Sequence, residues 1–259
     1  MIIKRNFKYT VKETYRKLHI YLPDNYYQTK ECYPVVYFFD GHNLFNDEDA
    51  TFGKSWGLRT FLDSWGKKLI IVGMECSPDG AERISEYLPY PADTKCRFAD
   101  TVPLGDSTMN WIIHEIKPFI DQEYRTIPFR EATGIIGSSM GGLMSLYALV
   151  QYNQWFSKAG CISTSLEFCM EPLVSNISQS NLCTDSRVYL SWGSCEAKDD
   201  RVLDADDRCS ETYKRNLCIH DLLQKQGINT KMRCQIGGGH REIYWEKLVP
   251  DFMEYLWLS

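Results

Sequence analysis

Apolar and polar residues alternate along the first part of the chain. Residues 7–11 and residues 18–22 each carry an apolar side chain at every second position. A period of two is typical of β-strands that bury one face and expose the other. We therefore expect the chain to begin with two half-buried strands that pair in an antiparallel arrangement.

A second pattern consists of short runs that are apolar throughout, over residues 35–39, 69–72 and 134–136. Strands of this kind are usually buried on both faces, as in a parallel sheet. Two further strands are expected over residues 187–192 and 231–236. The second of these alternates strictly, which favours a place at the edge of the sheet.

Apolar residues at helical spacing lie between these runs. They predict helices over residues 113–120, 143–150 and 244–256, the last one kinked at Pro250. Strands that alternate with helices imply right-handed crossovers and a doubly wound sheet. The predicted fold class is therefore α/β, with a mostly parallel sheet and antiparallel N-terminal strands, in a single domain over residues 1–259.

Two long polar stretches, residues 76–108 and 164–186, interrupt this alternation. Connections of this length are where lids and substrate-binding loops are usually built. We expect both stretches to lie above the sheet.

Composition and charge narrow the functional classes. The formal net charge is −5, so the chain has no basic excess with which to bind nucleic acid. No apolar run reaches the roughly 18 residues that span a bilayer, and the first residues lack the apolar segment of a signal peptide. These features predict a cytoplasmic protein without a nucleic-acid or membrane partner.

The cysteines do not indicate a disulfide framework. There are 10 of them, scattered along a long chain and without a CxxC pair, so we expect reduced thiols. Because Cys and His are not paired at ligand spacing, a structural zinc site is not expected, and we predict that no metal is bound.

The strongest chemical signal is the pentapeptide Gly137-Ser138-Ser139-Met140-Gly141, which has the form G-x-S-x-G. It follows an apolar strand and precedes a helix, which is the context of a nucleophile elbow. The sharp turn leaves no room for bulky side chains two positions before and after the serine, and both positions are glycine. Of the two adjacent serines only Ser139 has this spacing, so we predict that Ser139 is a nucleophile.

A serine hydroxyl needs a general base, and in this fold the order along the chain is Ser, acid, His. Only His220 and His240 follow the elbow far enough to leave room for an acid. His240 comes after three glycines, between the last predicted strand and the last helix, where loops lie above the carboxyl end of the sheet. His220 lies inside a helical pattern that ends at Gly227. We predict His240 as the base.

The acid should follow the strand predicted over residues 187–192. The segment after this strand is so rich in acids that a solvated, charged loop explains most of them. Glu196 comes first, where the strand has just ended, and we predict it as the acid. Asp199 and Asp200 remain alternatives.

Acyl transfer also needs two backbone N–H donors for the oxyanion. One is the amide of Met140, at the positive end of its helix. The other should come from the loop after residues 35–39, where Gly41 lets the backbone approach closely; we predict the amide of His42. The side chains of His42 and Asn43 are candidates for substrate contact, and a structural role in the loop explains each of them equally well.

Four segments together resemble the esterase D-like putative esterase family. They are residues 39–45 (FDGHNLF), 115–126 (EIKPFID followed by YRT), 137–142 (GSSMGG) and 237–240 (GGGH). That family is similar to the feruloyl and acetyl xylan esterases of carbohydrate esterase family 1, to enterobactin-type esterases and to S-formylglutathione hydrolases. The resemblance implies an α/β-hydrolase fold and a Ser-acid-His triad that works without a cofactor.

Carried over by position, the resemblance places the nucleophile on Ser139, the base on His240 and the acid on Glu196. It implies a serine carboxylesterase that acts on a small-molecule ester of a small acyl or phenolic acid, with carbohydrates among the alcohols. An acyltransferase would use the same triad, and a binding protein could keep the fold without turnover. The intact serine, histidine and glycines favour an enzyme. Oligomeric state and acyl length leave no pattern in the sequence.

Overall fold

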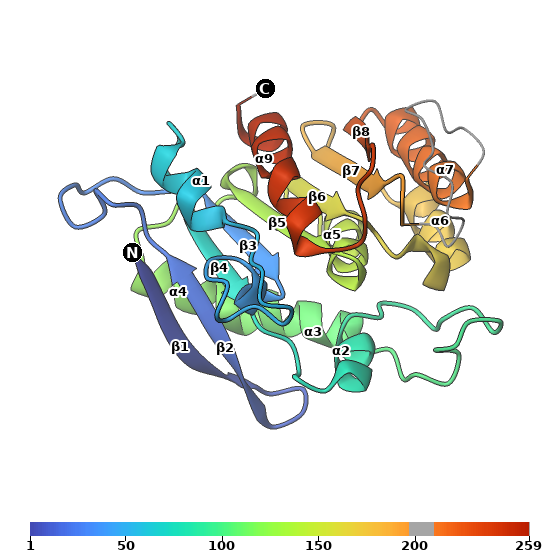
Figure 1. Cartoon of the computed structure of the whole chain (residues 1–259), viewed down its shortest axis with the longest axis horizontal. Coiled ribbons are helices and arrows are strands. Elements are labelled where there is room, and N and C mark those ends of the chain that lie inside the picture. Colours follow the sequence, from blue (N-terminus) through green and yellow to red (C-terminus); the bar gives the residue numbers. More distant parts are fainter. Residues whose placement is uncertain (197–209, 259) are drawn as a thin grey trace.

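A single mixed sheet lies at the centre of the computed structural model, which describes residues 1–196 and 210–258 (Figure 1). Within these residues its strands are β1 (Ile2–Tyr9), β2 (Thr14–Tyr21), β3 (Val35–Phe39), β4 (Ile70–Met74), β5 (Thr133–Ser138), β6 (Lys158–Ile162), β7 (Arg187–Gly193) and β8 (Asn229–Gln235). Their order across the sheet is β1-β2-β4-β3-β5-β6-β7-β8.

The pairing of the strands confirms the predicted fold class. β1 pairs with β2, and β2 with β4, in antiparallel register, whereas β3 to β8 run parallel. The alternating strand predicted near the C-terminus is β8, and it lies at an edge as expected. A mostly parallel sheet with antiparallel N-terminal strands is the result.

Strand β6 has no counterpart in the sequence analysis. Its sequence, KAGCI, is short and contains a glycine, so it gives no apolar run. The structure supplies the reason for the glycine: a Cβ on Gly160 would lie 2.8 Å from the Ile136 side chain of the neighbouring strand β5. Tight contact between the two strands excludes a larger residue at this position.

Helices cover both faces of the sheet. They are α1 (Leu58–Ser64), α2 (Gly80–Glu86), α3 (Gly105–Trp111), α4 (Lys117–Glu123), α5 (Met140–Gln151), α6 (Met170–Gln179), α7 (Glu211–Lys225), α8 (Glu242–Trp245) and α9 (Val249–Trp257). A π-helical turn, Ile112–Ile116, joins α3 to α4. Short 3-10 turns are η1 (Gly41–Asn43), η3 (Arg130–Ala132), η4 (Leu166–Phe168) and η5 (Glu246–Leu248).

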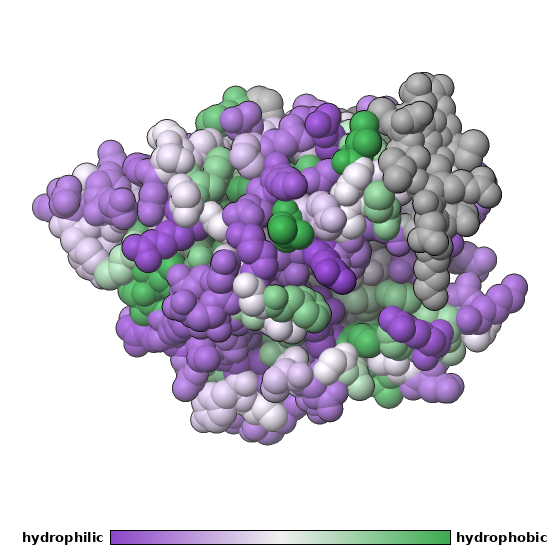
Figure 2. All heavy atoms as spheres, viewed as in Figure 1, coloured by the Kyte–Doolittle hydropathy of each residue, from purple (hydrophilic) through white to green (hydrophobic). Residues whose placement is uncertain are grey.

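Two apolar clusters form the core, one on each face. Helices α1, α8 and α9 pack over one face, and α3 to α7 pack over the other. Burial on both faces explains why the central strands are apolar throughout. The molecular face seen in Figure 2 is largely hydrophilic, with apolar side chains in small separate areas, as is usual for exposed apolar residues.

The end of the chain differs from the prediction of one kinked helix. The segment forms α8, the turn η5 and then α9, with Pro250 in the first turn of α9. Proline lacks an N–H group, but the first turn of a helix has no carbonyl to receive one. Pro250 therefore starts a helix here instead of kinking one.

The two polar stretches also contain helices. Residues 76–108 include α2 and the start of α3, joined by a loop that extends away from the sheet (Figure 1). Residues 164–186 include α6, whose Leu173 and Ile177 are fully buried in the core. The second stretch is thus partly a core element, not only an excursion.

The described part of the chain contains neither a membrane-spanning helix nor a disulfide among the cysteines named below. No helix there combines the length and the hydropathy needed to cross a bilayer. The following cysteines are free thiols: Cys32, Cys76, Cys96, Cys161, Cys169, Cys183, Cys195 and Cys218.

Candidate active site

Ser139 occupies a sharp turn between β5 and α5. Its φ of 58° and ψ of −122° are unusual for a residue with a side chain. A Cβ on Gly137 would lie 2.5 Å from the backbone of Gly141, and a Cβ on Gly141 would lie 2.9 Å from Phe39. The two glycines are therefore required by the turn, which has the form of a nucleophile elbow.

The two adjacent serines have different surroundings. Ser138 ends β5 and is buried, whereas Ser139 is partly exposed. The Ser139 Oγ lies 3.2 Å from the Ser165 Oγ, and its N–H donates to the Ile162 carbonyl at 2.9 Å. These bonds anchor the turn to the end of β6 and to the segment that follows it.

His240 and Glu196 meet at the same edge of the sheet. His240 follows β8, and its Nδ1 lies 3.3 Å from Glu196 Oε2. Glu196 follows β7 and is 10% exposed, against 42% for the imidazole. The alternatives Asp199 and Asp200 lie outside the described residues. His220 is on α7, as its helical pattern predicted.

The second oxygen of the Glu196 carboxylate is fixed from two sides. Oε1 accepts the backbone N–H of Gly193 at 2.8 Å and the hydroxyl of Ser163 at 2.6 Å. Hydrogen bonds to one oxygen leave the other free to face the imidazole, so the carboxylate has a defined orientation.

One open cleft of about 1000 Å³ brings the candidate residues together. Ser139 and His240 both line it, as do His42, Asn43 and Trp245. The volume is sufficient for a small-molecule ligand.

The segment after β3 lines the cleft together with His240. Asp40 has a φ of 56°, and the chain then enters η1. A Cβ on Gly41 would lie 2.3 Å from the Gly73 backbone, so this loop packs directly on β4. The Asn43 N–H donates a hydrogen bond to the Asp40 carbonyl at 2.9 Å. Met140 begins α5, and the first N–H groups of a helix have no carbonyl within the helix to which they can donate.

The side chains of His42 and Asn43 both have protein partners. His42 Nε2 lies 2.8 Å from the Thr51 hydroxyl, and burial lowers the pKa of this imidazole despite the nearby carboxylates. Asn43 accepts the Thr51 N–H at 2.9 Å and donates to Glu242 at 3.3 Å. These contacts hold the loop against the segment that carries His240.

An ion pair that the sequence analysis did not identify supports this loop. Arg83 of α2 donates to both oxygens of Asp40, at 2.8 and 2.7 Å. Burial raises the pKa of the Asp40 carboxyl, but the charge and hydrogen bonds of Arg83 outweigh burial and leave it below its ordinary value. The pair links α2 to the turn that precedes His42.

Replacing Asp40 by Asn should lower the free energy of unfolding by about 2–3 kcal/mol, because it leaves a largely buried guanidinium without its counter-charge. Asparagine tolerates the positive φ, so the backbone is preserved. A depressed pKa in the folded state stabilises the protein above the ordinary Asp pKa of about 3.9, and this stabilisation is lost as the pH falls through the folded value.

Urea unfolding at pH 7 and at a series of values below pH 4 measures this prediction. The difference between wild type and Asp40→Asn should be complete at pH 7 and shrink below pH 4. Glu13→Gln is the matched control, because Glu13 also has a positive φ but forms an exposed pair with Lys8. A difference that does not change with pH would contradict the assigned role.

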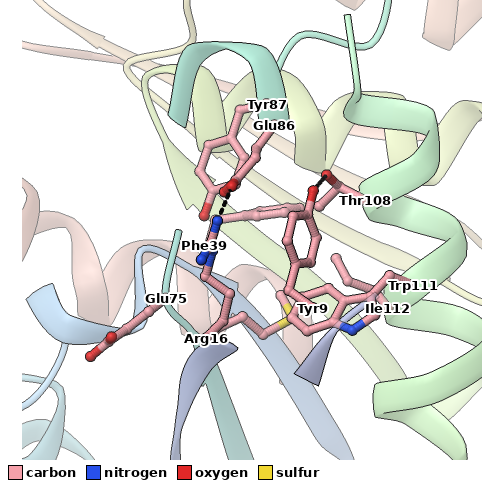
Figure 3. A pocket seen from close by; sticks show the side chains of 10 residues that line it. Tyr9, Arg16, Phe39, Glu75, Glu86, Tyr87, Thr108, Trp111 and Ile112 are labelled. Atoms are coloured by element: carbon pink, nitrogen blue, oxygen red, sulfur yellow. Dashed lines mark hydrogen bonds and ion pairs between the residues drawn. The ribbon is translucent and has the colours of Figure 1, made fainter. Parts of the chain in front are cut away.

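A second cavity lies between the sheet and helices α2 and α3 (Figure 3), and Arg16 and Glu75 line both this cavity and the cleft. In the second cavity Arg16 forms a buried ion pair with Glu86, and the Tyr9 hydroxyl lies 2.8 Å from that of Thr108. Its volume of about 10 Å³ has room for about one water molecule and not for a substrate. The larger cleft is therefore the candidate active site. Within residues 1–196 and 210–258, no group of three or more His, Cys, Asp or Glu is arranged to hold a metal ion.

Comparison with known proteins identifies the family of this chain. The model of the putative esterase family matches residues 11–255. The chain is similar to the uncharacterized proteins YbbA and YjcH of Bacillus subtilis, with 27% identity over 93% of this chain and 92% of YbbA, and 25% over 92% of this chain and 89% of YjcH.

Solved structures with the same fold include an IroE-like serine hydrolase from Shewanella oneidensis, at a TM-score of 0.74 and 20% identity over 98% of this chain and 79% of that one. A ferulic acid esterase aligns at 0.68 and 16%, over 99% and 97%. The enterobactin esterase from Shigella flexneri aligns at 0.72 and 15%, over 99% of this chain and 59% of its own. The protein belongs to the putative esterase family and is a carboxylic ester hydrolase with the α/β-hydrolase fold.

Proposed function

We propose that the protein is a serine carboxylesterase with Ser139 as nucleophile, His240 as general base and Glu196 as the acid of the triad. The observation that carries the proposal is the strained turn at Ser139. It lines the same cleft as the imidazole of His240, which contacts the largely buried carboxylate of Glu196. A strained serine turn is costly, and such strain is found where function requires it.

The proposed reaction proceeds through an acyl-enzyme. Ser139 Oγ attacks the ester carbonyl carbon while His240 Nε2 accepts its proton, and the bond to the alcohol oxygen breaks as that proton is transferred to it. Water then attacks the acyl carbon and gives a proton to His240. The bond between the acyl carbon and Ser139 Oγ breaks as His240 returns that proton to Oγ, which releases the acid and regenerates the serine hydroxyl. Glu196 keeps the Nδ1 proton in place, so that Nε2 is the basic nitrogen. In this scheme the amides of Met140 and His42 donate to the oxyanion.

The proposed substrate is a small-molecule ester of a small acyl or phenolic acid, with carbohydrates among the alcohols. The open cleft supports a small-molecule substrate, because its lining extends from Ser139 to residues of β1 and β2. Two proteins with this fold are named as a ferulic acid esterase and an enterobactin esterase, and these names favour phenolic esters as the substrate class. We place the reaction in the cytoplasm and assign it no cofactor.

A screen of p-nitrophenyl esters of increasing acyl length, alongside acetylated and feruloylated oligosaccharides, tests the proposal. Ser139-dependent hydrolysis that is unchanged by chelators is the expected result. Added alcohols, with product analysis, distinguish transfer from hydrolysis. Release of one equivalent of p-nitrophenol without further turnover would contradict an esterase, and a requirement for added divalent metal would contradict the proposed chemistry.

A further inference from the structure

Four neighbouring strands of the sheet end around the candidate triad. Ser139 follows β5, Glu196 follows β7 and His240 follows β8. The strand between the nucleophile and the acid is β6, and the residue directly after it is Ser163. Ser163 is not a member of the candidate triad, but it lies between the nucleophile and the acid and donates a hydrogen bond to Glu196.

Ser163 is buried and held in an uncommon conformation. Ser163 is only 3% exposed, and its φ of 48° is strained for a residue other than glycine. Its N–H donates to the Ser191 carbonyl of β7 at 2.8 Å. The backbone is thus fixed by the sheet, and the hydroxyl is directed into a site from which water is excluded.

The hydroxyl of Ser163 has two partners, and their chemistry decides the direction of both hydrogen bonds. The indole Nε1 of Trp245 lies 2.8 Å from Ser163 Oγ, and an indole N–H can only donate. Ser163 Oγ therefore accepts a hydrogen bond from Trp245 and donates one to Glu196 Oε1, at 2.6 Å. A chain of bonds runs from the indole through the hydroxyl to the carboxylate.

Both ends of this chain contact the imidazole of His240. Glu196 Oε2 faces its Nδ1, and the ring of Trp245 packs edge-on against it, with ring centroids 5.1 Å apart at 84°. If the hydroxyl is removed, the Gly193 N–H is the only described donor left on Oε1, so the carboxylate is held less firmly relative to the imidazole that Oε2 faces.

We propose that Ser163 is a positioning residue: its buried hydroxyl fixes the carboxylate of Glu196 in the orientation that holds His240. The role rests on the proposed esterase function. It does not require Ser163 to touch the substrate, so the effect of its loss should fall on kcat and leave KM nearly unchanged.

Removal of the hydroxyl by Ser163→Ala should lower kcat for p-nitrophenyl acetate about tenfold, since hydrogen bonds to a charged group are among the stronger ones. The rate of Ser139 labelling by a fluorophosphonate should fall by a similar factor. Ser163→Gly also lacks the hydroxyl but relieves the positive φ, so it should show the same loss of kcat even if Ser163→Ala folds poorly.

The matched control is Ser191→Ala. Ser191 is a buried serine on the adjacent strand β7, and within the described residues its hydroxyl has no hydrogen-bond partner. Its removal should leave kcat within about twofold of wild type. Thermal unfolding of all variants identifies any loss that comes from instability.

A double-mutant cycle with Glu196→Gln separates positioning from a general structural effect. If Ser163 acts through Glu196, adding Ser163→Ala to Glu196→Gln should lower kcat by less than about twofold. Two results would overturn the role of Ser163 while leaving the proposed esterase function intact. One is an equal tenfold loss of kcat from Ser163→Ala in the wild type and in Glu196→Gln, and the other is full kcat in both Ser163→Ala and Ser163→Gly. Wild-type protein without Ser139-dependent hydrolysis would instead contradict the proposed function, and this role with it.

Discussion

Replacing Ser139 by alanine should abolish turnover, with kcat for p-nitrophenyl esters falling by a factor on the order of 10⁵ to 10⁶, as in a serine hydrolase that loses its nucleophile. Ser138 should not replace it, because although both serines line the cleft, Ser138 is buried at the end of β5 and only Ser139 occupies the strained turn between β5 and α5. Labelling by a fluorophosphonate should disappear together with hydrolysis. The rate of ester hydrolysis and the mass of the labelled protein are the two measurements.

Ser138→Ala is the control for this experiment. It removes a neighbouring hydroxyl without touching the candidate nucleophile, so the variant should fold and keep measurable activity. Ser165 offers a second check, since its hydroxyl lies 3.2 Å from that of Ser139. Covalent label found by mass spectrometry on Ser138, Ser165 or any other serine would show that the nucleophile is misassigned.

Glu196→Gln should lower kcat by a factor on the order of 10³ to 10⁴, by analogy with triads in which the acid is replaced by its amide. The amide has almost the same shape, so the fold should be preserved. It carries no charge to stabilise the imidazolium that forms when Ser139 loses its proton. Its NH₂ group can also face Nδ1 and favour the wrong tautomer of His240.

Asp199→Asn and Asp200→Asn are the comparisons that make this result specific. Each should cost much less, because Glu196 already contacts His240 at 3.3 Å and is held by two donors on its other oxygen. Steady-state kinetics with circular dichroism on all three variants is sufficient. If Glu196→Gln keeps nearly full kcat while one of the other two loses it, the acid is that residue, and the assignments of Ser139 and His240 remain.

The effects of Glu196 and Ser163 should differ in size as well as in cause. Loss of the acid removes the charge next to the imidazole, whereas loss of the hydroxyl removes one of the bonds that orient this charge. The loss of kcat should therefore be largest for Ser139→Ala, which removes the nucleophile, and smaller for Glu196→Gln, which removes the charge that supports His240. It should be smallest for Ser163→Ala, which removes only a hydrogen bond that positions this charge.

Much of the fold could be predicted from the sequence because it depends on local patterns. Alternation over residues 7–11 and 18–22 correctly predicted two antiparallel strands, and the apolar run at 35–39 marks a strand buried on both faces. The half-buried character expected for 18–22 was wrong: residues 18–21 of β2 are buried on both faces, because Leu18 and Ile20 pack in one apolar cluster and Tyr21 packs in the other. The form G-x-S-x-G likewise records a local steric demand. The glycines at 137 and 141 are needed because a Cβ at either would meet backbone or side-chain atoms within 3 Å.

Other features had no local signal. Strand β6 contains only five residues with a glycine among them, and it is a strand because β5 and β7 pair with it on both sides. Pro250 looks like a kink in the linear sequence, but the chain places it where a helix begins. In both cases tertiary packing decides what local propensity leaves open.

The sequence by itself determined the α/β fold class and singled out Ser139, His240 and Glu196 as candidates, since strand order and glycine spacing are written along the chain. Only the tertiary structure decided what surrounds them. Asp40 with Arg83, and Ser163 with Trp245, are pairs 43 and 82 residues apart. Buried charges and hydroxyls need partners, and a folded chain finds these partners by proximity in space, which no spacing in the sequence encodes.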